Sequence, residues 1–290
     1  MGKFPSSDPT SKQTGIDGNN YTREVFFYTA IADTVDIQTP VVYATELDED
    51  THDFIVLMED LAPGVQIDQM SECSVDQAAL ALEELAKLQG PRWGDPTLAT
   101  EPLLNRTTSE AGSIYSLVQP GFLDRYADRL SAADQNMVRQ FGALQSAYGN
   151  YDGERTLIHI DYRLDNMIFG GPHALTVLDW QTLSLGCALN DASYFMGTSL
   201  SPARRAKEEE NLLKHYLQVL NSYNVDLTWN TCWQQYRHNA PAGLAMAVIA
   251  SMVVGETERG NDMFMTMAKR SVAMCEELET LSLLSTSASL

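Results

Sequence analysis

The sequence predicts an α+β fold, in which a small mixed part of about 60 residues precedes a mostly helical part. Strand-like and helix-like segments alternate near the beginning of the chain. Helical periodicity prevails afterwards and is interrupted by one predicted β-hairpin. Hydrophobic residues make up 44% of the 290 residues and charged residues 20%, so a sizeable core can form. We place the border near Pro63 and Gly64, which divides the chain into residues 1–62 and 63–290.

The first part is expected to contain one helix and two paired strands. Residues 21–35 place apolar side chains at helical spacing, with Glu24 in the first turn. Residues 39–47 and residues 54–61 have the composition of strands, and the acidic run between them suits a solvated turn. The two strands therefore predict a hairpin.

Helix signals recur through the second part. Ser74 can accept a hydrogen bond from the Gln77 N–H while the Gln77 side chain reaches back, which is the capping box of a helix start. Ser201 precedes Pro202, and proline is favoured at the first helical position. The predicted helices cover residues 74–90, about residues 131–148, residues 202–224 and residues 261–281.

The charge balance and the cysteines restrict the partners and the compartment. A net charge of −20 argues against nucleic acid as a partner, because phosphates require Lys and Arg. The charge is compatible with a cationic substrate, although a solvated acidic surface is the simpler account. The four cysteines form no CxxC pair, which indicates free thiols in a reducing cytoplasm. They are Cys73, Cys187, Cys232 and Cys275.

Two apolar stretches near the end of the chain predict buried helices. The run from Ala242 to Gly255 is shorter than the roughly 20 apolar residues that a bilayer span needs, so we expect no membrane association. Met263, Met265 and Met267 lie on the last predicted helix. We expect these methionines to pack in the core rather than to face a ligand.

Residues 157–181, LIHIDYRLDNMIFGGPHALTVLDWQ, carry the residues of most chemical interest. Two strand-like segments flank the turn signal at Gly170–His173, which predicts a β-hairpin. Asn166 precedes the first strand and Asp179 ends the second. Asp161 lies in the loop that leads into the first strand. Folding the hairpin therefore brings the three side chains to one end.

This set of side chains suits phosphate chemistry with a hard cation. An amide and a carboxylate at one end of a hairpin are ligands that Mg²⁺ accepts, and Mg²⁺ usually shares its shell with waters and phosphates. A further carboxylate that the metal does not need can orient a hydroxyl group and accept its proton. Asp161 is the candidate for that role, with Asn166 and Asp179 as the metal ligands.

The segment HIDYRLDNMIF, together with VLDWQ, resembles the catalytic loop and metal-binding hairpin of the aminoglycoside phosphotransferase and choline kinase superfamily. Further stretches, among them YTREVFFY, FIVLMEDLAPG and LNDASYF, are similar to its ecdysteroid-kinase-like branch. The resemblance implies a protein-kinase-like fold of two lobes. Residues 1–62 would form a truncated N-lobe with the lysine strand, a helix and the hinge hairpin. Residues 63–290 would form a helical C-lobe with the catalytic loop and the acceptor pocket.

The resemblance also implies a role for each matching residue of the catalytic loop. Asp161 matches the catalytic aspartate, and Asn166 and Asp179 match the ligands of Mg²⁺. His159 matches a histidine that holds the loop rather than reacting. Arg163 is a further candidate for the catalytic site, either binding phosphate or substrate or forming a surface ion pair.

The nucleotide-binding residues follow from the same resemblance. Lys3 matches the lysine that contacts the α- and β-phosphates of ATP, and Glu24 matches the helix glutamate that pairs with it. Asp191 matches a buried aspartate that braces the catalytic loop. The hinge, whose backbone bonds adenine, corresponds to Met58, Glu59, Asp60 and Leu61.

Two positions depart from the family pattern. Ile160 stands between the loop histidine and aspartate, where the superfamily usually has glycine. In the family, two strands joined by a glycine-rich loop precede the lysine strand, whereas here the lysine is residue 3. We therefore expect Lys3 on an exposed edge strand or a frayed end, and weak affinity for ATP.

Three functions compete. The first is a kinase that transfers the γ-phosphoryl group of ATP to a hydroxyl group of a small molecule. The resemblance includes aminoglycosides, choline-like amines, sterols and hydroxyacyl compounds as acceptors. The second is a catalytically impaired kinase fold that serves as a binding or scaffold protein. The third, a metal-dependent hydrolase using His159 and Asp161, lacks ligands, because the other histidines form no cluster with metal spacing.

Overall fold

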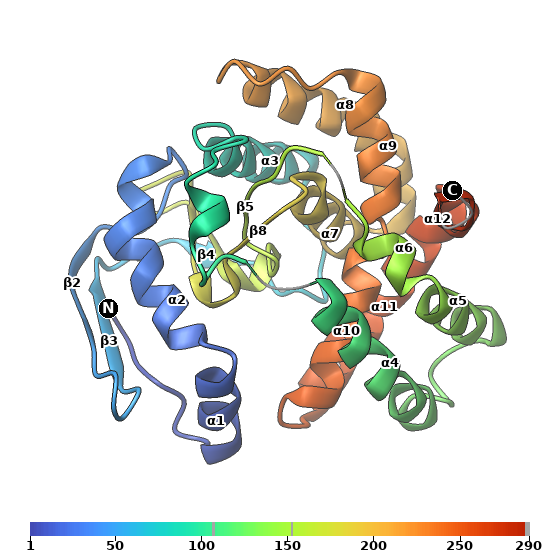
Figure 1. The fold of residues 1–290 in the computed structure, drawn as a ribbon, viewed down its shortest axis with the longest axis horizontal. Coiled ribbons are helices and arrows are strands. Elements are labelled where there is room, and N and C mark those ends of the chain that lie inside the picture. Colours follow the sequence, from blue (N-terminus) through green and yellow to red (C-terminus); the bar gives the residue numbers. More distant parts are fainter. Residues whose placement is uncertain (106–107, 152, 288–290) are drawn as a thin grey trace.

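The computed structural model describes residues 1–105, 108–151 and 153–287. Figure 1 shows the N-terminal elements on one side of the molecule and the later helices on the other. The strands are β1 (Gly2–Lys3), β2 (Val42–Leu47), β3 (Phe54–Met58), β4 (Val65–Gln66), β5 (Thr156–Ile158), β6 (Met167–Phe169), β7 (Leu175–Val177) and β8 (Ser184–Gly186).

The helices account for most of the remaining ordered structure. They are α1 (Pro9–Asp17), α2 (Asn20–Phe26), α3 (Val75–Gln89), α4 (Thr108–Arg125), α5 (Ala132–Ala143), α6 (Gln145–Gly149), α7 (Leu189–Ser199), α8 (Pro202–Asn221), α9 (Trp229–Asn239), α10 (Ala242–Val253), α11 (Glu258–Glu277) and α12 (Thr280–Ser287). The predicted α+β class, with a small sheet before a helical part, is confirmed.

The first sheet is antiparallel, with the strand order β1-β3-β2. Strand β1 is at the edge of this sheet, and Lys3 pairs with Val56 of β3. Lys3 thus lies on an edge strand, as predicted. The inner face of the sheet buries Val56, Phe54 and Met58, and Phe54 stacks on Tyr21 with ring centroids 4.8 Å apart. This packing fixes the start of α2 against the sheet.

The helix predicted over residues 21–35 is not continuous. Helix α2 ends at Phe26, a π-helical turn covers Phe27–Ile31, and a 3₁₀ turn covers Ala32–Thr34. Phe27 is fully buried and stacks on Trp180, with ring centroids 3.6 Å apart. This contact joins the first helix to the residue that follows Asp179.

The predicted catalytic hairpin is present. Strands β6 and β7 pair in antiparallel register, and Gly170 and Gly171 adopt positive φ angles of 76° and 83° in the connection. Strand β4, which the sequence analysis did not predict, adds a third strand beside β6. Strand β5 pairs with β8 in a separate two-stranded sheet just before the loop that carries Asp161.

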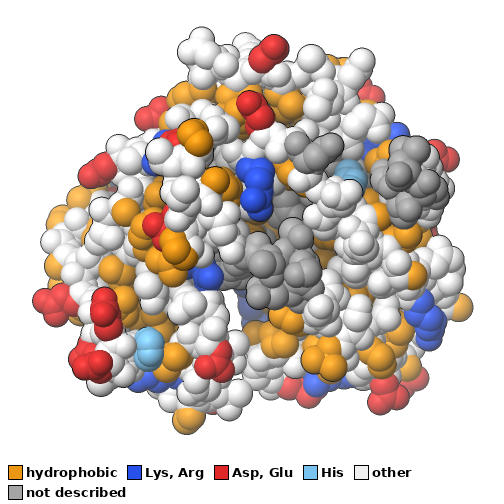
Figure 2. Space-filling view, in the orientation of Figure 1, with side chains coloured by type: hydrophobic (Ala, Val, Ile, Leu, Met, Phe, Trp, Pro, Cys, Tyr) orange, Lys and Arg blue, Asp and Glu red, His pale blue; other side chains and the backbone are white. Residues whose placement is uncertain are grey.

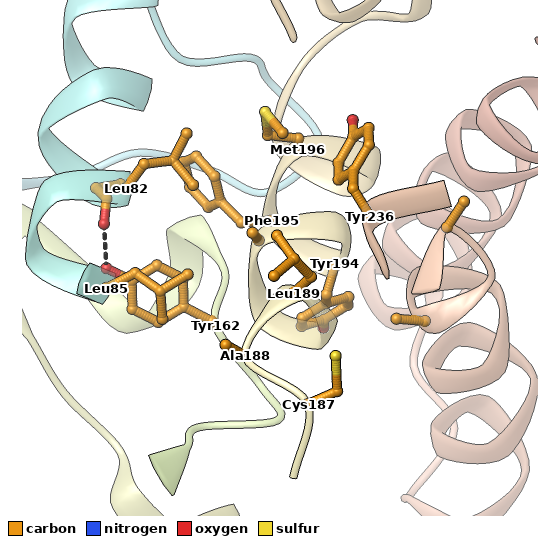
Figure 3. Close-up of a cluster of buried hydrophobic side chains, with 14 of the residues drawn as sticks. Leu82, Leu85, Tyr162, Cys187, Ala188, Leu189, Tyr194, Phe195, Met196 and Tyr236 are labelled. Carbon is orange, nitrogen blue, oxygen red and sulfur yellow. Dashed lines mark hydrogen bonds between the residues drawn. The ribbon is translucent and has the colours of Figure 1, made fainter. Parts of the chain in front are cut away.

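The helical part forms one large core. Helix α3 packs against α8, and α10 packs against α11 and α4. Figure 3 shows Leu82 and Leu85 of α3 facing Tyr162 and the start of α7. The Tyr162 hydroxyl donates a hydrogen bond to the Ala81 carbonyl at 2.6 Å. The residue next to Asp161 is therefore anchored in the core.

Several helix predictions are confirmed, and one predicted helix is divided in two. The capping box of Ser74 and Gln77 is formed, and α8 begins at Pro202. The helix expected over about residues 131–148 is divided into α5 and α6 at Leu144. The apolar run that begins at Ala242 forms α10. No helix in the described residues has the length and hydropathy needed to cross a bilayer.

The structure shows the state of the cysteines and the distribution of acidic side chains on one face. All four cysteines are buried free thiols. In Figure 2, Asp and Glu side chains are spread around the rim of the visible face rather than gathered in one patch. The visible face therefore shows no single acidic patch that would attract a cation, although the chain has a net charge of −20.

Candidate active site

The catalytic loop brings Asp161 and Asn166 into direct contact. The Asn166 Nδ2 atom donates hydrogen bonds to Asp161 Oδ2 at 2.9 Å and to the Asp161 carbonyl oxygen at 2.8 Å. The Leu178 N–H donates to the Asn166 carbonyl at 2.9 Å, which places the next residue, Asp179, beside Asn166. The three polar residues predicted to converge at one end of the hairpin do so.

The carboxylate of Asp161 is surrounded by hydrogen-bond donors. Its Oδ1 atom accepts a hydrogen bond from the Tyr194 hydroxyl at 2.8 Å and lies 2.9 Å from Arg163 Nε. Burial alone would raise the pKa of Asp161, but the Arg163 cation and then the Tyr194 hydrogen bond lower the pKa below its usual value. Asp161 is therefore ionised at neutral pH and able to accept a proton.

Arg163 forms ion pairs within the loop. Besides its contact with Asp161, its guanidinium lies 3.0 Å from Asp165 Oδ2 and 3.0 Å from the sulfur of Met263. Burial opposes the charge, but Asp161 and then other neighbours raise the pKa of Arg163. The sequence left open whether Arg163 binds a ligand or forms an ion pair, and the structure contains the ion pair.

A buried carboxylate holds the start of the loop. Asp191 of α7 accepts hydrogen bonds from the backbone N–H groups of His159 at 2.6 Å and of Ile160 at 2.9 Å. The Asp191 side chain is 0% exposed, and burial raises its pKa. This is the contact expected of a bracing aspartate, because the two amides would otherwise be buried without partners.

His159 is fully buried between the loop and the hairpin. Its Nε2 atom lies 3.0 Å from the Leu178 carbonyl oxygen, and its carbonyl accepts a hydrogen bond from the Thr182 hydroxyl at 2.6 Å. The ring packs near Trp180, with centroids 4.8 Å apart. These contacts fit a histidine that holds the loop, and the buried ring has no surface with which to touch a substrate.

Ile160 has a left-handed backbone conformation, with φ of 68°. A β-branched residue rarely adopts this region, because its Cβ crowds the following carbonyl. Glycine carries no such penalty, which explains why this position favours glycine in the family pattern. The two hydrogen bonds of Asp191 and the packing of Tyr162 retain the conformation here.

Lys3 joins the small sheet to the hairpin. Its Nζ atom lies 3.0 Å from Glu24 Oε2 and 3.0 Å from Asp179 Oδ1. The Glu24 contact is an ion pair without the angles of a good hydrogen bond. Burial raises the pKa of Glu24 to about 7, with Lys3 lowering it and Asp179 raising it. Burial lowers the pKa of Lys3, but Glu24 and then Asp179 raise it, and the net effect is a raised pKa.

The predicted hinge follows β3. The Met58 N–H donates a hydrogen bond to the Met1 carbonyl at 2.9 Å, and the Met58 carbonyl accepts one from the Met1 amino group at 2.7 Å. The Glu59 side chain accepts from the Val41 N–H at 2.8 Å and lies 3.0 Å from His173 Nε2. Within the described residues, the Glu59 carbonyl and the Leu61 N–H have no hydrogen-bond partner. The Asp60 carboxylate accepts from the Ala62 N–H at 3.1 Å.

The oxygen atoms beside Asp161 fit a magnesium ion. In the described residues, the Asn166 side-chain oxygen accepts no hydrogen bond, and Asp179 is 39% exposed with Lys3 as its cationic partner. An amide oxygen and an exposed carboxylate suit Mg²⁺, which retains several water ligands. The described ranges contain no group of three or more acidic, histidine or cysteine side chains placed to hold a metal ion, so an ion at this site would rest on one amide oxygen and one carboxylate.

A pocket of about 350 Å³ adjoins the catalytic loop. Asp161, Arg163 and Tyr194 line this pocket together with residues of α10, of α11 and of the segment between these helices. Met263, Met265 and Met267 pack in the core as expected, and Met263 and Met267 also contribute to the pocket lining. Helix α11 turns one face toward the pocket. The sequence predicts that this face is apolar, but it does not show whether a neighbouring helix covers all of the face.

Tyr194 is a functional candidate that the sequence reasoning missed. It lies one helical turn after Asp191 on α7, a spacing that places both side chains on the same face. Asp191 bonds the loop backbone and Tyr194 bonds the Asp161 carboxylate. In the segment LNDASYF, the spacing of three residues between Asp191 and Tyr194 is the signal in the sequence that could have identified the tyrosine.

The two-part fold and the braced Asp-Asn loop define a phosphotransferase of the protein-kinase-like class. The chain belongs to the phosphotransferase enzyme family, whose model matches residues 19–225. The resemblance to the aminoglycoside phosphotransferase and choline kinase superfamily is thereby confirmed. Comparison with curated protein sequences finds no match.

Solved structures share the fold at low sequence identity. A choline/ethanolamine kinase family protein from Mesorhizobium loti has a TM-score of 0.54 and 15% identity, covering 95% of this chain and 83% of that chain. Choline kinase from Cryptosporidium parvum has a TM-score of 0.62 and 9% identity, with coverage of 95% and 81%. Choline kinase from Streptococcus pneumoniae has a TM-score of 0.53 and 13% identity, with coverage of 93% and 85%.

Proposed function

We propose that this protein is an ATP-dependent, Mg²⁺-dependent kinase that phosphorylates a hydroxyl group of a small molecule. The supporting observation is the position of Asp161, which lines a pocket of about 350 Å³ and also contacts Asn166. An acceptor in the pocket and a nucleotide beside Asn166 would meet at this carboxylate. Solved structures of this fold include proteins named as choline kinases, which accords with a small-molecule acceptor.

In the proposed reaction, Asp161 orients the acceptor hydroxyl and takes its proton. The hydroxyl oxygen forms a bond to the γ-phosphorus of ATP, while the bond from that phosphorus to the bridging oxygen breaks and ADP leaves. Asn166 and Asp179 would hold Mg²⁺, which neutralises charge on the phosphates when bound. The contacts that lower the pKa of Asp161 keep its carboxylate ionised, so that it can accept a hydrogen bond from the acceptor hydroxyl.

The small sheet would hold the nucleotide. Lys3, positioned by Glu24, would contact the α- and β-phosphates, which requires Lys3 to exchange its contact with Asp179 for the phosphates. The Glu59 carbonyl and Leu61 N–H are the hinge atoms open to adenine. Since catalysis in this class rests on positioning and charge neutralisation, each of these contacts would affect the rate.

The test is a phosphate-transfer assay on the purified protein with ATP, Mg²⁺ and a panel of hydroxylated compounds. Substitution Asp161→Asn should lower turnover by roughly 10²- to 10⁴-fold, because it removes the base while keeping the shape of the side chain. The Kd for ATP should change by less than about twofold, since Asp161 faces the acceptor.

Asp226→Asn, on an exposed residue outside the site, serves as the matched control and should behave as wild type. Wild-type turnover by Asp161→Asn would refute its assignment. A wild-type protein that binds no ATP in the presence of Mg²⁺ would refute the proposed kinase activity.

A further inference from the structure

The part of the pocket lining that comes from α10, α11 and the segment between them is mainly apolar. Its side chains recur at a spacing of four residues along α10 and α11, so each helix turns one face toward the pocket. The apolar lining residues are Met246, Ala250, Val254, Met263, Phe264 and Met267. The volume of about 350 Å³ lies within the range of small-molecule pockets, which are mostly apolar with a few polar groups.

The charged side chains that line the pocket are already paired with one another or with neighbours. Arg163 contacts Asp161 at 2.9 Å and Asp165 at 3.0 Å. Arg259 lies 3.6 Å from Asp68 and 3.5 Å from Asp165. Asp161 is the only carboxylate among the described lining residues, and Arg163 and Tyr194 also bond it.

These pairings disfavour a charged acceptor. An ammonium group that entered the pocket would lose its hydration beside two guanidinium groups, and the single carboxylate there is engaged. An anionic group would have to draw Arg163 from its close pairs with Asp161 and Asp165, because Arg259 is 55% exposed and offers only a contact screened by solvent. An uncharged apolar molecule loses little hydration and gains contact with the methionines, whose flexible side chains adapt to its shape.

We propose that the acceptor is an uncharged, largely apolar alcohol, bound with its hydroxyl at Asp161 and its carbon skeleton against α10 and α11. This inference rests on the proposed kinase function but concerns the pocket alone. The net charge of −20, which by itself is compatible with a cationic substrate, does not extend to this pocket, where two arginines face one aspartate.

A pair of probes of equal shape tests the charge preference. Choline carries a trimethylammonium group, and its neutral carbon isostere carries a tert-butyl group in the same place. Geraniol serves as a longer neutral alcohol. Binding of each probe to the full chain is measured by saturation-transfer NMR titration, with and without ATP and Mg²⁺, and phosphate transfer to each probe is measured in parallel.

We expect the neutral isostere to bind at least about tenfold more tightly than choline, because only the cation loses the hydration free energy of a charge on entering the pocket. Geraniol should bind more tightly still, because it covers more apolar surface. Choline binding as tightly as its isostere, or no binding of either neutral alcohol, would overturn the inference.

Two variants of Met246 test whether the pocket causes the preference for a neutral alcohol over choline. Met246 is half-buried on the pocket wall, so a carboxylate there keeps access to water. Met246→Glu should improve choline binding relative to its isostere by about tenfold, whereas Met246→Gln should not. An identical preference in both variants would place the choice of substrate outside this pocket and overturn the inference.

The two proposals fail in different ways. Phosphate transfer to choline in preference to the neutral alcohols would overturn the inference and leave the kinase function standing. Tight binding of the neutral alcohols at this pocket, without phosphate transfer to any probe or ATP binding, would support the pocket chemistry and refute the kinase function. The binding titrations give the first answer independently of turnover.

Discussion

The Tyr194 hydroxyl donates a hydrogen bond to Asp161 Oδ1 over 2.8 Å, from a side chain that is 1% exposed. Tyr194 projects from α7, the same helix whose Asp191 bonds two backbone amides of the catalytic loop. Figure 3 places Tyr194 among the packed side chains at the start of this helix. One rigid helix therefore determines the position of the loop and the orientation of its carboxylate.

Tyr194→Phe should make Asp161 a weaker acid. The Tyr194 hydrogen bond is one of the contacts that lower the pKa of Asp161, so its loss raises that pKa. Because the base must be ionised, the acidic limb of the pH–kcat profile should move to higher pH, and kcat should fall by roughly tenfold. Unfolding free energy should drop by about 1 kcal/mol.

Tyr216→Phe provides the matched control for this change. The Tyr216 hydroxyl is also buried and donates to Gln89 Oε1 at 2.6 Å, away from the catalytic loop. Its loss should cost similar stability without moving the pH profile. If both variants moved the profile equally, Tyr194 would have only a structural role.

Asp179→Ala should weaken the Mg²⁺-dependent binding of ATP. Asp179 is the carboxylate beside Asn166, and few other anionic ligands are present to neutralise the ion. The Mg²⁺ concentration that gives half-maximal ATP binding should rise by at least about tenfold, as seen in a calorimetric titration. The exposed Asp33→Ala serves as control, and an unchanged Mg²⁺ requirement in Asp179→Ala would exclude Asp179 as a principal ligand.

Glu24→Gln should change how stability depends on pH. Burial raises the pKa of Glu24 from its ordinary value of 4.5 to about 7, so the folded state holds this proton more tightly than the unfolded state. The stabilisation from this proton is complete below about pH 4.5 and is lost as pH rises through about 7. Glu24→Gln should therefore flatten the fall in unfolding free energy across this window.

Urea unfolding at several pH values measures this effect, with the exposed Glu258→Gln as control. The control should retain the wild-type slope. A slope in Glu24→Gln equal to that of wild type would mean that Glu24 is ionised in the folded protein throughout the window.

At position 160, a glycine variant should be more stable than an alanine variant, which is the reverse of the usual order. At φ of 68°, Ala retains the Cβ penalty and Gly does not, so Ile160→Gly should be more stable than Ile160→Ala by about 1 kcal/mol. At Ile158 in β5, the order should be normal, with Ala more stable than Gly by roughly 0.5–1 kcal/mol. Denaturant unfolding of the four variants decides, and the same order at both positions would exclude strain at Ile160.

Part of the site was predictable because its contacts are local. Asp161 and Asn166 are five residues apart and meet within one loop, and Asn166 meets the end of β7 across a short hairpin. Turn residues and alternating strands encode such contacts directly. The break of the first helix after Phe26 was not predictable, because it accompanies the stacking of Phe27 on Trp180, which is distant in sequence.

The sequence by itself determined the fold class, the hairpin and the candidate loop residues, since these depend on periodicity and on side chains close along the chain. Only the tertiary structure decided which side chains share the pocket with Asp161. Its walls come from α10 and α11, far along the chain, and are joined to the loop by burial of apolar surface. The burial of apolar surface is non-directional, so the sequence pattern of an apolar helix does not show which element it packs against.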